Sequence, residues 1–545
     1  MITAARIRQE IWQNMPRQEW DILVIGGGIT GAGIALDAAS RGLKVALVDM
    51  HDFASGTSSR STKLIHGGLR YLKNFEWGLV RETGIERAIA YKNAPHLVRP
   101  EPMLLPVLNG GSMSRNAISL GVWFYDFLAD VPRKQRRIML DKQECLAKEP
   151  LLNKDLVKGA ALYHEYRTDD ARLTIEVLKT ARNHGACVLN YAKAEKPIFE
   201  NGKIVGFTIQ DMLSEQKMDL KAKVVINAAG PWVDQVRIAA QSLNDKHLVW
   251  SKGVHLVFSK EKLNVKQACY VDVLPQKGRM IFIIPRDEST YVGTTDTFFP
   301  SPDNPDVTLE DVHYLLDALN AVLDIPKLEV KDIQSSWCGL RPLIHHAGKP
   351  SSELSRKDEI FVSEKGLITI AGGKLTGYRK MAQRTVDKAI ELGRLPKSKS
   401  HTAQIVLQGG HINGSLDAYI YQKAEECTQI PFEYKQVERL VFKYGSEIDK
   451  IIEMAYTLYN ADRSLTAPLL MAEIQYAIEQ EFVQCPADFY IRRTGMLYFY
   501  RDEIPMHQKL YGSFMQEKLG LQTDQFTEKQ AEMKQTFHDA LSFVS

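Results

Sequence analysis

The chain has 545 residues, of which 44% are hydrophobic and 25% are charged, and its formal net charge at pH 7 is +3. This length is sufficient for two or three domains with sizeable cores. The small net charge argues against a nucleic-acid-binding protein, although a local basic patch could serve an acidic substrate or a lipid surface. The six cysteines are scattered without a C-x-x-C pair, which is typical of a reduced cytoplasmic protein and predicts neither disulfides nor a metal site.

The beginning of the chain predicts a short packing helix and no export signal. The first twenty residues mix Arg and Glu with apolar positions and lack the continuous apolar segment of a secretory signal. Nowhere do eighteen apolar residues follow one another, so any contact with a membrane is expected to be peripheral, at the inner face of the cell membrane.

The stretch from Asp21 to Ala35 predicts a dinucleotide-binding turn. A short apolar strand runs into Gly26, Gly28 and Gly31, which have the spacing G-x-G-x-x-G, and a helix of small residues follows. The first glycine permits a tight turn, the second lets the backbone approach a pyrophosphate, and the third lets the helix pack on the strand. A second strand ends at Asp49, near the offset expected for an acid that binds ribose hydroxyls.

Two segments that come after Asp49 in the chain each have two interpretations. The hydroxyl-rich segment His51–Lys63 could line a cofactor, or it could be a solvated loop that caps a helix. The apolar helix expected over Ala117–Leu128 is followed by the basic cluster Arg133–Arg137. This pair of segments could lie on an anionic membrane, or it could be a core helix followed by a solvated loop.

The later part of the chain, from about residue 167, returns to the nucleotide fold twice. Strands are expected at 186–191, 203–209 and 222–227, and the last ends in a small-residue turn that is expected to face the cofactor. Strands at 253–258, 280–285 and 291–295 predict an inserted antiparallel sheet for the substrate. The strand, glycine turn and helix beginning at Leu367 are expected to complete the first sheet, and the tail from about 411 reads as helical.

Together these blocks resemble the flavin-dependent glycerol-3-phosphate dehydrogenases, quinone-linked enzymes of the D-amino-acid-oxidase-like flavoprotein superfamily. The blocks that carry the resemblance are Ile25–Gly33, Thr57–Leu72, Asp169–Leu173, Asn227–Trp232, Lys252–His255, Gly293–Asp296, Gly339–Pro342 and Gly372–Arg379. The family pattern also has glutamate at position 49 and a second threonine at position 377, where this chain has Asp49 and Gly377. The second difference puts a hydroxyl contact at that position in doubt.

The resemblance implies an α/β fold with an FAD-binding Rossmann-like domain, an inserted antiparallel-sheet substrate domain and a helical C-terminal cap domain. The expected FAD-binding segments are 1–75, 161–235 and 341–395, the substrate domain is 236–340, helical and substrate-domain segments occupy 76–160, and the cap domain is 396–545. It also implies that FAD is bound by Gly26, Gly28, Gly31, Asp49, Thr57, Ser58, Ser59, Lys63, Leu64, His66, Gly67, Gly230, Trp232, Gly372, Gly373, Lys374, Leu375 and Thr376.

The implied reaction is the oxidation of sn-glycerol 3-phosphate to dihydroxyacetone phosphate, with the electrons passed to a membrane quinone. The implied substrate-binding residues are Arg70, Tyr71, His255, Arg341, Lys374 and Thr376. Two alternatives are an oxidase that uses oxygen and a non-catalytic flavin-binding sensor. The resemblance leaves open whether the chain forms a homodimer.

The expected chemistry assigns roles to His255, His66, Arg341 and Lys374 as catalytic residues. Oxidising a secondary alcohol requires a base for the hydroxyl proton, and histidine is suited to this near neutral pH. We favour His255 as the base, with His66 nearer the flavin. A guanidinium fork suits a phosphate dianion, which favours Arg70 and Arg341, and Lys374 is expected to hold negative charge on the reduced cofactor.

Overall fold

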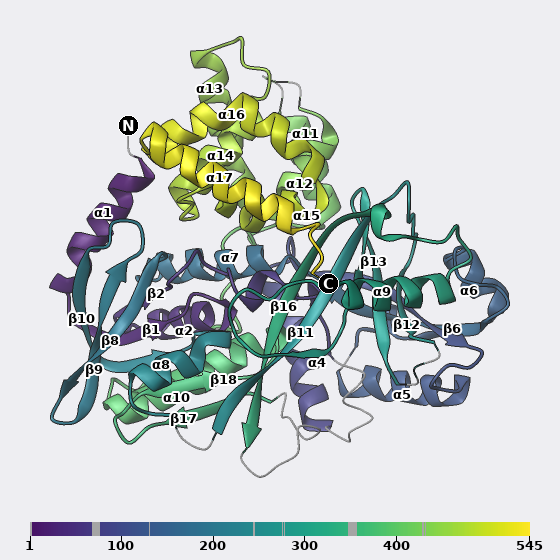
Figure 1. Ribbon diagram of the computed structural model, residues 1–545, viewed down its shortest axis with the longest axis horizontal. Helices are drawn as coiled ribbons and strands as arrows, with labels where there is room; N and C mark the ends of the chain where they lie inside the picture. Colours follow the sequence, from purple (N-terminus) through teal and green to yellow (C-terminus); the bar gives the residue numbers. More distant parts are fainter. Residues whose placement is uncertain are drawn as a thin grey trace.

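The computed structural model describes residues 3–67, 77–129, 131–243, 246–274, 276, 278–346, 357–427, 430 and 432–544. Two β-sheets lie side by side, and a bundle of helices from the C-terminal part of the chain covers them on one side (Figure 1). Within the described ranges, no helix is both long enough and apolar enough to span a bilayer.

The first sheet is assembled from three distant parts of the chain. Its strands, in spatial order, are β17 (Glu359–Val362), β18 (Ile368–Ala371), β10 (Lys217–Asn227), β1 (Trp20–Ile25), β2 (Val45–Val48) and β7 (Cys187–Leu189). From β18 to β7 all neighbours are parallel, and the hairpin of β8 (Ala192–Glu200) and β9 (Lys203–Asp211) extends β10. Ile226 is paired with Ile368, which confirms that the late strand completes the sheet begun near residue 21.

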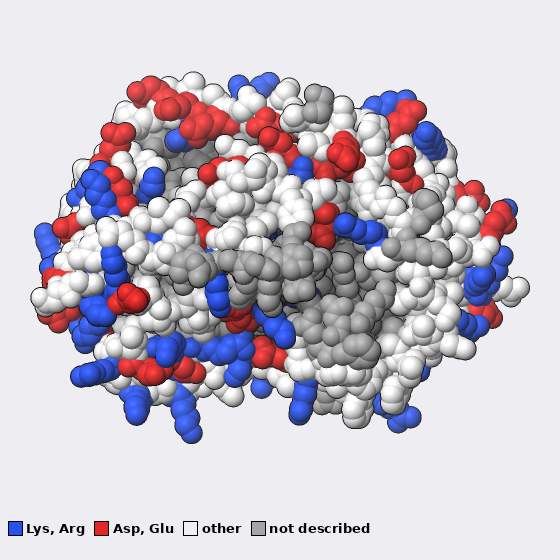
Figure 2. Space-filling model, turned by 60° about the horizontal axis from the view of Figure 1, so that its bottom comes forward, with Lys and Arg blue, Asp and Glu red and all other residues white. Residues whose placement is uncertain are grey.

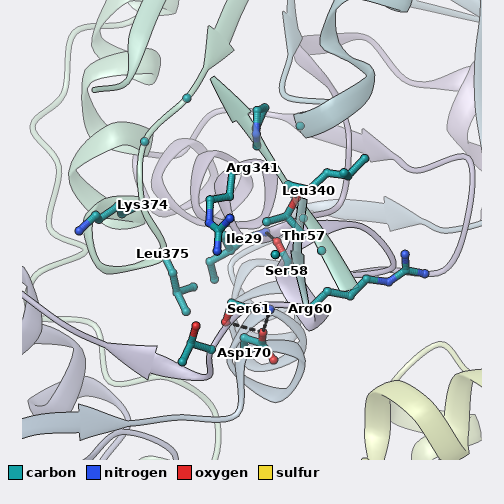
Figure 3. A pocket seen from close by; sticks show the side chains of 18 of the residues that line it. Ile29, Thr57, Ser58, Arg60, Ser61, Asp170, Leu340, Arg341, Lys374 and Leu375 are labelled. Carbon is teal, nitrogen blue, oxygen red and sulfur yellow. Dashed lines mark hydrogen bonds between the residues drawn. The ribbon is translucent and has the colours of Figure 1, made fainter. Parts of the chain in front are cut away.

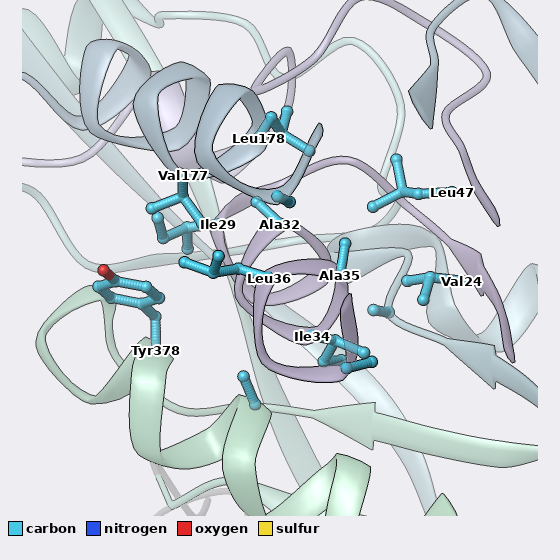
Figure 4. Packing of buried hydrophobic residues seen from close by; sticks show 14 of the residues in the cluster. Val24, Ile29, Ala32, Ile34, Ala35, Leu36, Leu47, Val177, Leu178 and Tyr378 are labelled. Carbon is cyan, nitrogen blue, oxygen red and sulfur yellow. The ribbon is translucent and has the colours of Figure 1, made fainter. Parts of the chain in front are cut away.

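The small-residue helix α2 (Ile29–Ser40) is packed closely between two other helices. It contacts α7 (Asp170–Asn183) on one side and α10 (Tyr378–Gly393) on the other (Figure 4). A Cβ added at Gly33 would lie 3.1 Å from the Tyr378 ring, and one at Gly31 would lie 1.8 Å from the Gly26 carbonyl oxygen. Glycine and alanine dominate this helix because larger side chains would push the neighbouring elements away.

The second sheet is the expected inserted sheet, and it is larger than the sequence indicated. Its strands, in order, are β15 (Thr297–Phe299), β11 (Lys246–Ser259), β14 (Ser289–Gly293), β13 (Met280–Arg286), β12 (Ala268–Asp272), β4 (Arg99–Leu108), β6 (Val157–Arg167) and β3 (Leu64–Ile65). β16 (Ile333–His346) also pairs with β11, and β5 (Ile138–Leu140) pairs with β6. Every pair is antiparallel except β12 with β4.

Several strands of this sheet cross the domain limits expected from sequence. β3 lies within the segment 1–75 that we assigned to the FAD-binding domain, and β6 and β16 run across the limits at 160 and 340. Alternation of apolar residues indicates a strand, but it does not identify the strand with which it pairs. Helices α4 (Trp77–Asn93), α5 (Arg115–Leu128), α6 (Lys142–Lys148), α8 (Val233–Ala239) and α9 (Leu309–Val322) complete this part of the chain.

The C-terminal part is helical, as expected. Its helices are α11 (Leu416–Glu426), α12 (Tyr434–Tyr444), α13 (Ile448–Ala461), α14 (Pro468–Gln480), α15 (Met496–Phe499), α16 (Ile504–Leu519) and α17 (Thr523–Asp539), with a π-helical turn at Asp488–Arg493. The packing helix expected at the beginning of the chain is α1 (Ala4–Asn14). Buried ion pairs connect the bundle to the first sheet's helices, among them Arg172 with Glu481.

Candidate active site

A cavity of about 1400 Å³ is lined by residues of both sheets. The first sheet contributes the glycine turn after β1, the end of β2, and the turns that follow β10 and β18. The second sheet contributes residues of β11, β13 and β16. The carboxyl ends of parallel strands are where α/β sheets bind nucleotides, and the cavity lies at this edge.

The glycine turn forms one end of the cavity. Gly26 has a φ of +111°, and a Cβ there would lie 2.5 Å from the Ala228 carbonyl oxygen. Gly28 lines the cavity directly before α2, so the N-terminal, positive end of the helix lies at this space. This bare backbone at the positive end of a helix suits a pyrophosphate.

Asp49 is held against the same turn. Its Oδ2 accepts a hydrogen bond from the Gly27 N–H at 2.6 Å, and its Oδ1 accepts one from the His51 N–H at 2.9 Å. Burial raises the pKa of the Asp49 carboxyl to about 6. The residue lines the cavity at the end of β2, where a ribose would lie beside the turn.

The hydroxyl-rich segment has features of both interpretations, because it lines the cavity and Ser58 also caps the start of α2. Thr57 and Ser58 lie in a 3₁₀ turn (Thr57–Ser59) and face the cavity, and Ser58 Oγ accepts a hydrogen bond from the Ile29 N–H at 2.9 Å. Lys63 lies behind them, where its ammonium pairs with Asp170 at 2.7 Å and donates to the Ser59 carbonyl at 3.0 Å. Leu64 faces the cavity at the start of β3.

The turns after β10 and β18 form further parts of the wall. Gly230 and Trp232 lie in a 3₁₀ turn (Gly230–Trp232) and face the cavity. Gly372 and Gly373 have φ values of +73° and +85°, which favour glycine. They precede Lys374, Leu375 and Thr376, which also line the cavity and lead into α10.

His255 is a buried, uncharged base candidate on β11. Its Nε2 lies 3.0 Å from Thr62 Oγ1, and its ring stacks on Trp337 with centroids 4.8 Å apart. Burial, followed by the nearby charges of Arg341 and Lys63, lowers the pKa of His255 well below its usual value. The imidazole is therefore neutral at pH 7, and its Nδ1 has no hydrogen-bond partner within the described residues.

Arg341 on β16 extends a partly exposed guanidinium into the same cavity (Figure 3). Nη2 donates to Thr294 Oγ1 at 3.1 Å, and Nη1 donates to Ser251 Oγ and to the Thr295 carbonyl, both at 3.3 Å. Asp296 lies 3.7 Å from Nη1. These contacts fix the direction of the guanidinium, and a position fixed in advance is what recognition of an oxyanion requires.

His66 and Lys374 face the cavity on another part of its wall. The His66 carbonyl accepts a hydrogen bond from Thr376 Oγ1 at 3.0 Å, which connects β3 to the turn after β18. In Figure 3 the Lys374 ammonium points away from the Arg341 guanidinium. The two cations therefore do not converge on one point in this arrangement.

Some of the expected site residues are not brought to the cavity. Gly31, Ser59, Lys63 and Gly67 do not line it and instead support the wall from behind. The Gly67 N–H donates to the buried carboxylate of Glu165 at 3.2 Å. Arg70 and Tyr71 lie outside the described residues.

Sequence reasoning missed Thr62, Thr294 and Asp296, which face the cavity beside His255 and Arg341. Thr62 is separated from His255 by 193 positions, so no local pattern connects them. Thr62 lies in the block Thr57–Leu72, and Thr294 and Asp296 lie in the block Gly293–Asp296, so membership of these blocks was the available signal.

Comparison with known proteins decides the family. A family model described as FAD dependent oxidoreductase matches residues 21–379, and one described as the C-terminal domain of alpha-glycerophosphate oxidase matches 400–526. The aerobic glycerol-3-phosphate dehydrogenase of Bacillus subtilis is 46% identical over 542 residues, which cover 98% of this chain and 97% of that protein. The chain belongs to the aerobic glycerol-3-phosphate dehydrogenase family of FAD-dependent oxidoreductases.

Other relatives agree with this assignment. The Staphylococcus aureus aerobic glycerol-3-phosphate dehydrogenase is 48% identical over 502 residues, covering 90% of this chain and 89% of that protein. The structure of the Bacillus halodurans glycerol-3-phosphate dehydrogenase complexed with FAD has a TM-score of 0.85, 41% identity and 99% coverage of both chains. The L-alpha-glycerophosphate oxidase of Mycoplasma pneumoniae shares the fold, with a TM-score of 0.55 and 19% identity over 70% of this chain and 97% of that chain.

The cofactor of this flavoprotein family member is FAD, as the resemblance implied. The residues present fit that cofactor. The bare glycine turn before α2 suits the pyrophosphate, the Asp49 carboxylate suits the ribose, and the Gly372–Gly373 turn contributes backbone without side chains to the lining. A Cβ at Gly26 would press on Ala228, so the turn has no room for a side chain.

Proposed function

We propose that this family member oxidises sn-glycerol 3-phosphate to dihydroxyacetone phosphate and passes the electrons to a membrane quinone. The observation that carries the proposal is that a neutral buried histidine and a fixed guanidinium face the same cavity as the two glycine turns. The names of the relatives that are 46% and 48% identical support the substrate assignment.

In this proposal His255 removes the hydroxyl proton of the substrate. Bound FAD supplies the acceptor for the hydride from the carbon that carries this hydroxyl group, and the carbon–oxygen single bond becomes the double bond of a carbonyl. Thr62 fixes one ring nitrogen of His255 by a hydrogen bond, and Trp337 fixes the plane of the ring. Because its pKa is lowered by burial, His255 is unprotonated at neutral pH and ready to accept a proton.

Arg341 binds the phosphate group, and its hydrogen bonds to Thr294 and Ser251 hold it in position to do so. A guanidinium forms two parallel bonds to a phosphate, which orients the substrate as well as attracting it. Lys374, Thr376 and the positive end of α10 favour negative charge at the other side of the cavity. Arg70 and Tyr71 remain proposed substrate ligands from the resemblance alone.

The quinone assignment is supported by an apolar part of the cavity. Helices α4 and α5 contribute Trp77, Ile118, Leu120 and Phe124 to its lining, and β13 contributes Phe282. Such a surface suits a flat, apolar electron acceptor, whereas the small, polar glycerol 3-phosphate does not require it.

The outer face of α5 supports peripheral attachment to the inner face of the cell membrane. Leu120, Trp123 and Phe127 are 66%, 51% and 71% exposed, whereas Val122 and Tyr125 on the other face are buried. The basic cluster Arg133–Arg137 follows directly. An apolar helix face beside basic side chains is typical of segments that lie in the interface of an anionic bilayer.

Figure 2 brings this side of the molecule forward. It has uncharged surface on the lower right, the side on which α5 lies in Figure 1, with both basic and acidic side chains at its edge. Of the two interpretations of Ala117–Leu128, the exposed apolar side chains of α5 support the membrane-surface helix over the core helix.

Anaerobic reduction tests the proposal. The purified yellow protein is expected to bleach when glycerol 3-phosphate is added without oxygen, and a soluble quinone is expected to restore the colour. No bleaching would contradict the oxidation and favour the non-catalytic sensor. In air, rapid oxygen consumption without any added quinone would instead favour the oxidase.

A further inference from the structure

The loop after Asp49 is held by the C-terminal helical domain. Asp52, three residues beyond the ribose-binding position, is fully buried and accepts hydrogen bonds from Arg493 Nη1 at 2.6 Å and Nη2 at 2.8 Å. The guanidinium of Arg492 also bonds to the Asp52 carboxylate, and Asn190 Nδ2 donates to it at 2.9 Å. Two arginines of the C-terminal domain therefore determine where this loop lies.

A second contact connects the same domain to the glycine turn. Phe53 is fully buried, and its ring meets the ring of Phe482 edge to face, with centroids 5.3 Å apart. On its other side Phe53 closes the space beside Gly27, where an added Cβ would lie 2.4 Å from the ring. The Ala54 N–H also donates to the Gly27 carbonyl at 3.2 Å. Phe482 thus supports the turn through Phe53.

The electrostatics connect the two sites as well. Burial acts to raise the pKa of Asp52, but Arg493 and Arg492 outweigh it and lower that pKa to about 2, so the carboxylate is always ionised. Arg492 also acts to lower the pKa of Asp49, and Asp52 acts to raise it. Removing Arg493 would leave the buried Asp52 carboxylate with Arg492 as its remaining guanidinium partner, and losing one of two partners of a buried charge is unfavourable.

We propose that Asp52, Arg493, Phe53 and Phe482 form a clasp through which the C-terminal domain sets the affinity of the protein for FAD. The clasp positions the loop that presents Asp49 and the turn that receives the pyrophosphate. Without the clasp the loop has no fixed position. Part of the free energy of FAD binding must then be used to order the loop, which weakens the affinity. Arg493 and Phe482 are positioning residues, because they act through Asp52 and Phe53.

The test measures FAD affinity directly. Holoenzyme variants are stripped of flavin, and FAD is titrated back while the quenching of flavin fluorescence is followed. We expect R493M and D52N to raise the Kd for FAD by about tenfold or more, because each breaks a buried charge pair. R493K, which retains the charge, is expected to recover part of the affinity.

A matched control separates the clasp from the docking of the domains. Arg172 and Glu481 form another fully buried pair between α7 and the C-terminal domain, with Nη1 to Oε2 at 2.5 Å and Nη2 to Oε1 at 2.8 Å. The Glu481 backbone carbonyl accepts hydrogen bonds from Arg493, so the control replaces Arg172 and leaves Glu481 in place. R172M is expected to lower the melting temperature while leaving the Kd for FAD within about twofold of wild type.

Two results would overturn the proposal: wild-type FAD affinity in both R493M and D52N, or a loss of affinity in R172M as large as in R493M. If R493M does not fold, D52N and F482L give the same decision, since F482L removes the ring that supports Phe53 and leaves the Asp52 ion pairs in place. The titration contains no glycerol 3-phosphate, so its outcome is independent of the proposed reaction.

Discussion

Replacing Arg341 tests the proposed phosphate site most sharply. If the guanidinium forms two charge-assisted bonds to the phosphate, each contributes about 1.5–3 kcal/mol, or about 3–6 kcal/mol together. The side chain is 29% exposed, so solvent screening favours the lower part of this range. A loss of about 3–4 kcal/mol corresponds to a decrease of about 10²–10³-fold in kcat/KM for R341A. R341K keeps the charge without the fork and is expected to lie between R341A and wild type.

The assay is anaerobic rapid mixing with glycerol 3-phosphate, in which the rate of flavin bleaching is followed over a range of substrate concentrations. Glycerol, which has no phosphate, provides the internal control, because the variant and the wild type should then react at similar low rates. An equal loss on both substrates would show that Arg341 supports the fold of the cavity and does not bind phosphate. Wild-type kcat/KM in R341A would refute the assignment outright.

Three further predictions concern the base, the ribose site and the membrane. H255A is expected to slow flavin reduction by about 10²–10⁴-fold in rapid mixing, the range for loss of a general base, and wild-type reduction would exclude His255 from that role. FAD affinity is expected to fall about tenfold from pH 7 to pH 5, because the pKa of Asp49 is raised to about 6 and the ionised carboxylate that accepts ribose hydrogen bonds is lost below it. D49N should bind FAD with little pH dependence over this interval, and an unchanged slope in D49N would assign the titration to another group. Neutralising Arg133, Lys134, Arg136 and Arg137 together should lower co-sedimentation with anionic vesicles, by about 1 kcal/mol per charge that lies at the surface, and an unaltered bound fraction would count against this cluster.

The sequence determined the nucleotide-binding architecture because short, local residue patterns specify that part of the fold. Gly26, Gly28 and Gly31 lie within six positions, and the acid of Asp49 follows at the end of the next strand. Steric limits act over these short distances: a Cβ at Gly31 would lie 1.8 Å from the Gly26 carbonyl oxygen. The strand near residue 367 and the helical tail could likewise be predicted from the periodicity of apolar residues.

Only the tertiary structure decided which distant groups meet. It brought Thr62 to His255 and made that histidine neutral by burying it, and it exposed one face of α5 while burying the other. It also carried Arg493 to Asp52, 441 positions away in the chain. Burial and long-range pairing depend on how whole sheets and helices pack, and no short segment of sequence contains that information. The sequence by itself thus determined the glycine turn after the first strand, and the packing decided how that turn is supported and what surrounds the proposed substrate site.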